Sequence, residues 1–536
     1  MMAGATRTRL VSRETSRANA VAGVAVVLAA ILFAMSLAAL FEVIPISDPI
    51  AGIPVVAILG GVLMLLGGAV IAFGLGSYLG AVETQPSPSA GVVAAAAFGI
   101  VWLVLVGIAV GRFLSLGSAG WIVALFVGGA AFAVTAVPRE DIGSTLPAGA
   151  ACLLVGATFL TGAIGPEWVW ELDFEQTASL TAEFVIPVAT LGAALLAGWA
   201  AAKAYGGFGA RGRRMGAYLL IYLNAGSIVG VLFLLLAFTT FRGLPGLFTG
   251  VEVGPGVGPS VFGIALPVSL PFVMNGVALL NDFQGVLPAI VGTIWLVIGA
   301  VLFAVPLGVG AAIFLTEYAE YGRITQIVEV ATNGLWSTPS IVFGLFGFAF
   351  LIPRFGGGKS LISGMLTLGF MLLPLVLITS REAMLAVPDE YRDASAALGV
   401  SKWQTIRSVV VPSALPGVVT GVILGVGRIA GETAPILLTM TGGTFVPGGQ
   451  TVDVIGGFEF TAAPPFVANP ELLQATTALP FQLYALITAG VGLGDNVASP
   501  EQFQWATAFV LLLVVLSFYA IGIGARYYFR RKLNHE

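Results

Sequence analysis

Two ionisable side chains, Arg428 and Glu432, stand in an otherwise apolar run at residues 408–440 that is long enough to cross a membrane. An ionisable group at membrane depth costs at least roughly 2.5–3.5 kcal/mol, so it normally faces a bundle interior or a water path. Four residues apart on one helix, the two side chains share a face and can pair. They are therefore either an ion pair that fixes helix packing, or a gate or substrate contact.

Further polar groups flank the neighbouring apolar runs. Arg381 ends the run 361–381, where it is either a basic anchor at the membrane surface or part of a path for substrate. Ser337, Thr338 and Ser340 surround a proline at an expected helix start. Their hydroxyls either cap this helix or, together with its free N–H groups, line a path for an anion.

A polar stretch at residues 388–412 separates two apolar runs and predicts two short helices. Pro388 suits the first turn of a helix, where its missing N–H costs nothing. Gly399 suits a left-handed C-terminal cap, and Ser401 with Gln404 forms the capping box S-x-x-Q of the second helix. The expected helix–glycine–helix elbow is either a knob that a partner grips or a solvated loop.

The composition of the chain indicates what must position these groups. Its 536 residues are 58% hydrophobic and 9% charged, with a mean hydropathy of +1.00. Soluble domains carry about 25% charged residues, so this chain cannot cover a soluble surface. Apolar runs of about 18 residues or more recur along it and are long enough to cross a bilayer core. We therefore expect an all-α polytopic membrane protein.

Twelve apolar runs are expected to be membrane spans. They are 21–42, 52–75, 91–111, 119–137, 146–164, 182–203, 215–240, 287–316, 334–353, 361–381, 408–440 and 504–526. A Gly/Arg-rich connector at 203–214 divides them into two blocks, with almost no charge inside the spans of the first. We expect an extension of about six helices at 1–205 and a second domain at 206–536.

Basic residues set the expected orientation, because they concentrate on the cytoplasmic side. They are Arg7, Arg9, Arg13, Arg17, Lys203, Arg211, Arg213, Arg214 and the segment 526–532. The acidic residues of one loop are expected outside; they are Glu167, Glu171, Asp173 and Glu175. With an even number of spans, both termini should be cytoplasmic in a multi-pass plasma-membrane protein.

Several chemistries are unexpected in this chain. It has one cysteine, Cys152, and one histidine, His535, whereas disulfides need two cysteines and His/Cys metal sites need clusters. The stretch RFGGGKS (354–360) resembles a nucleotide-binding loop, but Pro353 stands at the first glycine position and a membrane span precedes it. We therefore expect no cofactor, no metal, no nucleic-acid partner and no catalysis by this chain, and any pumping must draw energy from a partner.

The elbow resembles the EAA loop of ABC-transporter permeases, whose pattern is E-A-A-x3-G-x9-I-x-L-P. The matching residues are Asp393, Ala394, Ser395, Gly399, Val409 and Pro412. The residue types depart mildly from the pattern, but the spacing is intact. The resemblance implies that this loop is the coupling helix that docks on a separate cytoplasmic ATPase.

Flanking segments narrow the resemblance to the PstA-like phosphate permeases of that family. They are IVGTIWLVIGAVLFAVPLGVGAAIFLTEY (290–318), STPSIVFGL (337–345), RIAGETAPILLT (428–439) and ALPFQLY (478–484). The resemblance covers about 215–536 and implies a type I, MetI-like six-helix core at 287–528. It also favours Arg428 and Glu432 as part of the route of phosphate, and more weakly Arg381.

The resemblance further implies the partners of the chain. They are inorganic phosphate, a second, PstC-like permease, a dimer of PstB-like ATPases, an extracytoplasmic phosphate-binding protein met by the loops 241–286 and 441–503, and the lipid bilayer. Two alternatives stay open: an ABC permease for another oxyanion, such as sulfate or molybdate, and an ATP-independent carrier or channel. The EAA spacing argues against the second, since an elbow of this kind needs a partner to dock on.

Overall fold

The computed structural model describes residues 17–113, 119–172, 178–258, 260–261, 264–265, 267–276, 285–320, 322–441, 451–464, 466–488 and 499–533. Of the residues discussed above, Arg7, Arg9, Arg13, Asp173, Glu175 and His535 lie outside these ranges. The chain forms two compact units, Met1–Leu235 and Leu236–Glu536, hereafter unit 1 and unit 2. The division falls within helix α7, and the domain boundary expected at residues 205–206 stays a prediction.

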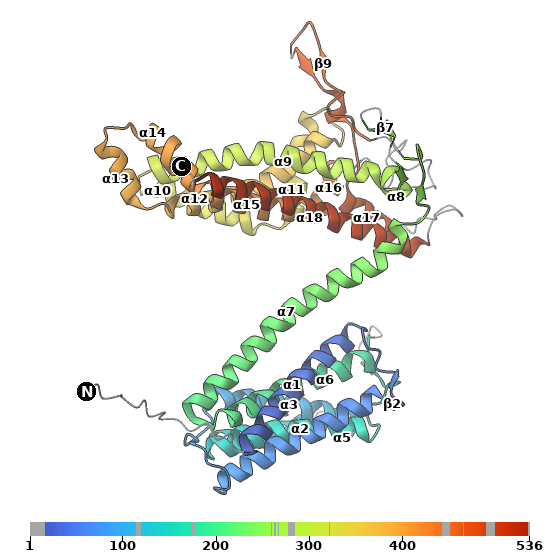
Figure 1. The fold of residues 1–536 in the computed structure, drawn as a ribbon, viewed down its shortest axis with the longest axis vertical. Coiled ribbons are helices and arrows are strands. Elements are labelled where there is room, and N and C mark those ends of the chain that lie inside the picture. Colours follow the sequence, from blue (N-terminus) through green and yellow to red (C-terminus); the bar gives the residue numbers. More distant parts are fainter. Residues whose placement is uncertain are drawn as a thin grey trace, which may run out of the picture. The chain divides into compact units, whose positions relative to one another are not determined.

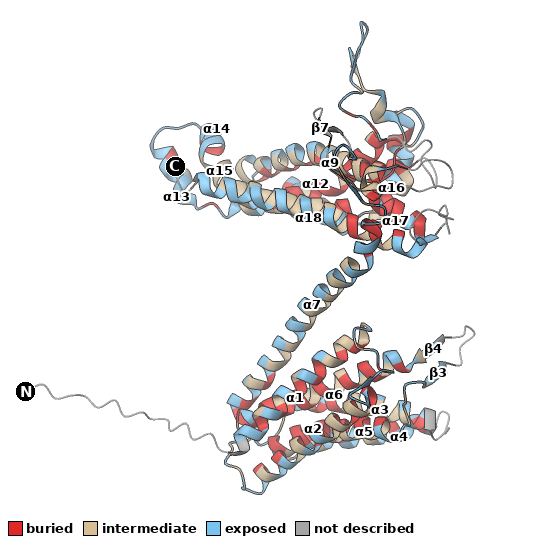
Figure 2. Cartoon of the chain, turned by 45° about the vertical axis from the view of Figure 1, so that its right-hand side comes forward, coloured by how far each residue is buried: buried red, intermediate tan, exposed pale blue. Residues whose placement is uncertain are grey.

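Unit 1 is a helical bundle. Its helices are α1 (Arg17–Leu40), α2 (Val55–Tyr78), α3 (Val92–Phe113), α4 (Gly120–Ala136), α5 (Glu140–Leu160), α6 (Ala182–Tyr205) and the first part of α7 (Gly209–Leu247). Two hairpins join β1 (Pro49–Ile50) to β2 (Ile53–Pro54) and β3 (Val169–Leu172) to β4 (Ala178–Thr181). Helices pack in pairs, α1 with α6, α2 with α5 and α3 with α4, and their buried sides face one another (Figure 2).

Small residues allow α2 and α5 to approach closely. A Cβ at Gly67 would lie 2.7 Å from the carbonyl oxygen of Gly149, and one at Gly156 would lie 2.8 Å from that of Gly60. Without a hydrophobic drive between helices in lipid, such small-residue contacts supply the packing. The glycine-rich composition of this block therefore has a structural purpose.

Unit 2 combines long apolar helical segments with shorter helices. Its α-helices are α8 (Pro271–Met274), α9 (Leu287–Ile313), α10 (Arg323–Ser337), α11 (Ser340–Phe346), α12 (Leu361–Leu385), α13 (Asp389–Ala397), α14 (Lys402–Thr405), α15 (Val411–Ala430), α16 (Ala434–Thr439), α17 (Leu479–Thr488) and α18 (Pro500–Leu533). Three π-helices, η2 (Phe314–Tyr318), η3 (Gly347–Leu351) and η5 (Ile406–Val410), and two 3₁₀ turns, η4 (Ile352–Arg354) and η7 (Pro470–Leu473), adjoin them.

Short antiparallel hairpins complete unit 2. They pair β5 (Glu252–Val253) with β8 (Val268–Ser269), β6 (Ser260–Val261) with β7 (Ile264–Ala265), and β9 (Glu459–Phe460) with β10 (Val467–Ala468). Within this unit, α13, α14 and the C-terminal end of α18 lie at one end, whereas α8 and α17 lie at the other (Figure 1). The elbow and the basic C-terminal segment therefore share a side.

The expected membrane spans are largely present, with three corrections. Ten described helices are long and apolar enough to cross a membrane, or eleven counting one bent pair. The run 119–137 forms α4 of only 17 residues, fewer than the roughly 20 that cross a bilayer. The run 334–353 begins in the last turn of α10 and contains the bend of 103° between α10 and α11. The run 408–440 is broken at Gly431, because α15 ends at Ala430 and α16 begins at Ala434.

A fourth correction concerns charge in the first block. The spans there were expected to hold almost none, but α5 begins at Glu140, six residues before the expected start. Glu140, Asp141 and Lys203 are all buried in unit 1. Hydropathy alone placed the two carboxylates in a loop. In the fold Glu140 pairs with Lys203 and Asp141 pairs with Arg139, which allows both carboxylates to lie inside the helix.

Candidate functional site

The break between α15 and α16 holds the two ionisable residues. Arg428 lies in the last turn of α15, and Glu432 follows Gly431 in the non-helical segment. They do not share one continuous helix, as expected, but their side chains still meet, with Arg428 Nε 3.8 Å from Glu432 Oε1. Both side chains are partly exposed. The break thus places a carboxylate beside an arginine at the end of a helix.

The guanidinium of Arg428 also packs against the ring of Trp336. The Arg428 Cζ atom lies 4.4 Å from the centre of the Trp336 ring, which belongs to α10. A guanidinium over an indole face is attracted to the π electrons while its N–H edges stay available. The sequence analysis missed Trp336, although the run GLWSTPS places it directly before the expected path residues.

The bend between α10 and α11 contains Ser337, Thr338 and Ser340. The hydroxyls of Ser337 and Thr338 donate to the Gly334 carbonyl oxygen at 3.0 and 2.8 Å. These two side chains therefore cap the end of α10 rather than the start of α11. Ser340 is the first residue of α11 and is half-buried.

The two breaks belong to neighbouring elements. Helices α11 and α16 pack together, and a Cβ at Gly344 would lie 2.9 Å from Pro435 Cα. This close approach of two short helices, each following a break, brings the segments of Ser340 and Glu432 into one region of unit 2. Irregular backbone at membrane depth is tolerated where it is buried in protein or lines a water-filled cavity.

Arg381 has a different partner. Its Nη2 lies 2.6 Å from Glu329 Oε1, which joins α12 to α10. Within the described part of the chain, Arg381 Nε and the Ser380 hydroxyl are buried without a hydrogen-bond partner. Two donors therefore remain for another acceptor. Sequence analysis missed Glu329 and Ser380, since nothing in local spacing marks either.

The elbow forms with the expected local signals. Helix α13 begins one residue after Pro388, which is the N-cap. Gly399 adopts φ of +72°, and the Ser401–Gln404 capping box is complete, which confirms both caps. The π-helix η5 then leads into α15, with Val409 inside η5 and Pro412 in the first turn of α15.

One arginine fixes the elbow to the bundle. Arg392 Nη2 lies 2.9 Å from Glu317 Oε1 and donates to the Met384 carbonyl oxygen, while its Nη1 donates to that of Val387. Charge-assisted, multidentate contacts of this kind are strong and directional. Arg392 was not singled out in the sequence, because its partners Glu317 and Met384 lie in other elements.

The outer surface of the elbow is apolar as well as charged. Leu398 is 82% exposed and Trp403 55% exposed, and Tyr391 is also exposed. Asp393 and Ala394 are exposed beside them, whereas Ser395 is buried and donates to the Tyr391 carbonyl oxygen at 2.9 Å. Val409 and Pro412 are half-buried, so they shape the frame rather than the surface.

The RFGGGKS stretch has no nucleotide-loop geometry. The 3₁₀ turn η4 precedes it rather than a strand, and Lys359 Nζ donates to the Leu437 carbonyl oxygen at 2.8 Å. Ser360 caps α12 by accepting from the backbone N–H of Ser363. The lysine thus joins the bundle through a main-chain contact.

Together these features define a multi-pass α-helical membrane protein with broken helices and a protruding elbow. Residues 304–535 match the family described as "Binding-protein-dependent transport system inner membrane component". The phosphate transport system permease protein PstA of Haemophilus influenzae is 32% identical over 255 residues, which are 47% of this chain and 78% of the relative. The chain therefore belongs to this family of transport permeases, with PstA proteins among its relatives.

Other relatives are covered less completely. The probable ABC transporter permease protein YqgI of Bacillus subtilis is 34% identical over 172 residues, 32% of this chain and 58% of the relative. PstA 1 of Mycobacterium tuberculosis is 42% identical over 154 residues, 29% of this chain and 50% of the relative. The chain thus spans about half to three-fifths of the length of these two. A solved MetNI methionine ABC transporter in an inward-facing conformation is 18% identical, with coverage of 46% of this chain and 94% of that chain and a TM-score of 0.33.

Proposed function

We propose that this chain is a permease subunit of an ATP-driven phosphate importer. It would form the translocation path with a second, PstC-like permease and would itself hydrolyse no ATP. Relatives named as phosphate transport permeases support the substrate. The observation that carries the proposal is the Arg428–Glu432 pair at the break between α15 and α16.

The geometry of this pair suits a gate. At 3.8 Å the Nε to Oε1 distance exceeds that of a hydrogen bond, so the carboxylate holds the arginine only loosely. A phosphate dianion would compete with Glu432 for the guanidinium, which binds oxyanions bidentately. Trp336 would keep the guanidinium oriented during the exchange. The resting pair would open when the anion arrives.

Further groups would extend the path. The unpartnered donors of Arg381 and Ser380 suit an anion, although Glu329 already neutralises the Arg381 charge. Ser337, Thr338 and Ser340 would contribute from the bend between α10 and α11. Because the Ser337 and Thr338 hydroxyls donate to Gly334, their free lone pairs rather than their protons face outward, which makes Ser340 the better donor of the three.

Energy would enter through the elbow. The exposed surface around Leu398 and Trp403 would dock on one subunit of a PstB-like ATPase dimer, with Asp393, Ala394 and Gly399 at the contact. ATP binding by that partner would move α13 and α14. Arg392 would transmit the movement to Glu317 in η2, which follows α9, and the packed helices would alternate between outward and inward openings.

The orientation follows from the same assignment. The elbow and the C-terminal basic residues share one end of unit 2 (Figure 1), and both would face the cytoplasm, as would the N-terminus. The segments at the opposite end, including β5–β8, would then meet an extracytoplasmic phosphate-binding protein.

Reconstitution tests the proposal directly. The chain is placed in liposomes with its neighbouring ATPase, second permease and binding protein, and ATP-dependent uptake of labelled phosphate is measured with sulfate and molybdate as competitors. Arg428→Ala should lower uptake at least about tenfold, the loss expected for one charge-assisted contact of about 1.5–3 kcal/mol. Arg428→Lys should restore only part of it, because an ammonium lacks the planar fork.

Arg354→Ala is the matched control. Arg354 also lies against an aromatic ring, 3.7 Å from the centre of Phe350, but it is not part of the proposed path. Its removal should leave uptake unchanged. Uptake of another oxyanion would keep the architecture and overturn the substrate, and uptake without ATP would overturn the assignment to an ATP-driven importer.

A further inference from the structure

Unit 1 contains a pocket that the transport proposal does not use. Its volume is about 430 Å³, and α3, α6, α7 and the segment before α3 enclose it. Nine of its lining residues are apolar; they are Ala90, Val93, Ala94, Ala97, Phe98, Leu195, Leu196, Trp199 and Leu220. The two others, Lys203 and Arg213, are cations.

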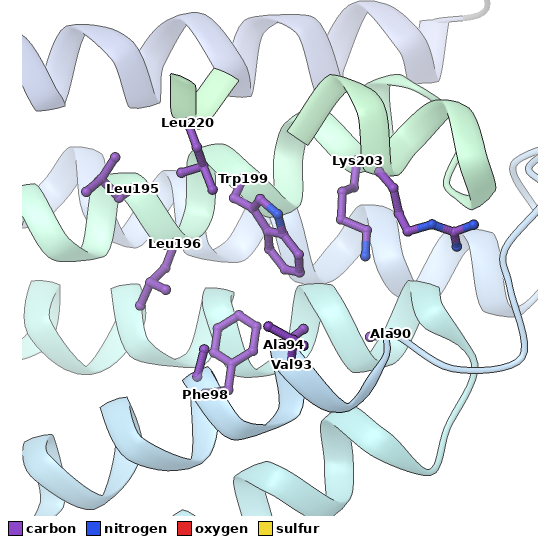
Figure 3. A pocket seen from close by; sticks show the side chains of 11 residues that line it. Ala90, Val93, Ala94, Phe98, Leu195, Leu196, Trp199, Lys203 and Leu220 are labelled. Carbon is purple, nitrogen blue, oxygen red and sulfur yellow. The ribbon is translucent and has the colours of Figure 1, made fainter. Parts of the chain in front are cut away.

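The cations lie at one end of the pocket. Lys203 is at one side of the view, Trp199 lies in the middle, and Leu195 and Leu196 lie towards the other side (Figure 3). Along α6 the distance from Lys203 to Leu195 is about 12 Å at 1.5 Å per residue. The pocket therefore has a polar head end and an apolar body, like the shape of an amphiphile.

A buried network fixes the head end. Lys203 Nζ lies 2.8 Å from Glu140 Oε1 and donates to the Ser144 hydroxyl. Arg213 Nη1 donates to the Ser87 hydroxyl at 2.6 Å and lies 3.5 Å from Glu140 Oε2. Two cations against one carboxylate leave one positive charge uncompensated at this end.

Arg213 has donors to spare. Among the described residues its polar contacts all use Nη1, so Nε and Nη2 remain for another acceptor. The side chain is 51% exposed, whereas Lys203 is 1% exposed and fully engaged. An anion would therefore meet Arg213, already oriented by Ser87 and Glu140.

The apolar body opens on an exposed apolar surface of unit 1. Val93 and Ala97 are exposed on α3, an apolar helix of membrane-spanning length. An arginine near a helix end commonly lies at the membrane interface, where lipid phosphates are found. A free phosphate ion would fill only the head end, and an uncharged hydrocarbon would leave the excess positive charge of Lys203 and Arg213 over Glu140 uncompensated.

We propose that this pocket binds an anionic phospholipid from the surrounding bilayer. One acyl chain lies along Trp199, Leu196 and Leu195, and the phosphate accepts hydrogen bonds from Arg213. The site lies wholly in unit 1 and does not depend on the transport proposal.

Native mass spectrometry of the purified full chain tests the assignment. Phosphatidylglycerol and phosphatidylcholine with identical acyl chains are titrated separately. The wild type should bind phosphatidylglycerol more tightly, and Arg213→Gln should weaken that binding about fivefold, as expected for one basic residue at an anionic lipid surface. Phosphatidylcholine binding should change less.

Two matched controls separate the pocket from the general surface. Arg214→Gln removes a neighbouring exposed charge that does not line the pocket and should leave both affinities unchanged. Ala97→Trp should fill the body and weaken binding of both lipids, whereas Ala96→Trp, on an exposed position outside the pocket, should not. Equal effects of the two arginine variants, equal wild-type affinity for the two lipids, or displacement of the lipid by inorganic phosphate would each overturn the proposal.

Discussion

At the scale of single residues, the stability of the buried ion pair Glu140–Lys203 depends on the contacts that its two charges make with neighbouring groups. Glu140 Oε2 accepts from the backbone N–H groups of Ser87 and Gly209 at 3.0 and 2.9 Å. The Lys203 ammonium also lies 4.4 Å from the centre of the Trp199 ring. Desolvation of the two charges is offset only because almost every polar atom has a partner.

Removing one member of this pair should therefore destabilise unit 1. Lys203→Met leaves the buried Glu140 carboxylate with only the half-exposed Arg213 as its counter-charge, and we expect a loss of about 3–5 kcal/mol. Thermal unfolding of the detergent-solubilised chain, followed by tryptophan fluorescence, would measure it. The double variant with Glu140→Gln should recover much of the loss.

A surface ion pair serves as the comparison. Arg242 Nη1 lies 3.4 Å from Glu501 Oε1, and both side chains are more than half exposed. Arg242→Ala should cost no more than about 1 kcal/mol. A loss as large as that of Lys203→Met would show that burial is not the reason for the effect.

At the scale of elements, the elbow tests whether local geometry controls coupling. Gly399→Ala would force a Cβ into the left-handed region, which costs roughly 1–2 kcal/mol. We expect α13 to tilt relative to α14 and the affinity for the proposed ATPase partner to fall about five- to thirtyfold. Co-purification or biolayer interferometry with that ATPase would measure the change.

Another loop glycine provides the control for this substitution. Gly358 also lies in open space, and its φ is not in the left-handed region. Gly358→Ala should therefore leave the affinity for the ATPase unchanged. Unchanged affinity in Gly399→Ala as well would contradict a coupling role for the elbow.

The same elements show what sequence could and could not predict. The elbow was predictable because Gly399 and the Ser401–Gln404 box act on their own neighbours. The break at Gly431 was not predicted, since hydropathy averages over 408–440, although Gly431 and the helix-starting Pro435 flank it. Partners such as Trp336 and Glu329 come from other elements, so no local pattern could show which charged residue each of them contacts.

At the scale of the whole molecule, the orientation can be mapped with thiol reagents. The single cysteine, Cys152, is buried, so Cys152→Ala gives a background without thiols. Ser401→Cys at the elbow and Ala463→Cys near β9 are both exposed positions. A membrane-impermeant maleimide should label Ala463→Cys in intact cells and Ser401→Cys only after permeabilisation.

The parent variant Cys152→Ala should stay unlabelled under both conditions, which controls for other reactive groups. Labelling of Ser401→Cys in intact cells would invert the proposed topology.

The class of the molecule was predictable from composition, because a chain with 9% charged residues has few other ways to fold. Which apolar runs form single straight spans was less predictable from composition, as the short α4 and the bent α10–α11 pair show.

The bend between α10 and α11 has an electrical consequence. The segment Ser340–Arg354 rises only about 22 Å at 1.5 Å per residue, less than the roughly 30 Å of a hydrocarbon core. With Arg354 at one membrane surface, the polar bend before this segment would lie within that layer and draw water inwards. A transmembrane voltage would then fall across a thinner insulating layer, so most of its work on an anion taking the proposed path would be done along α11.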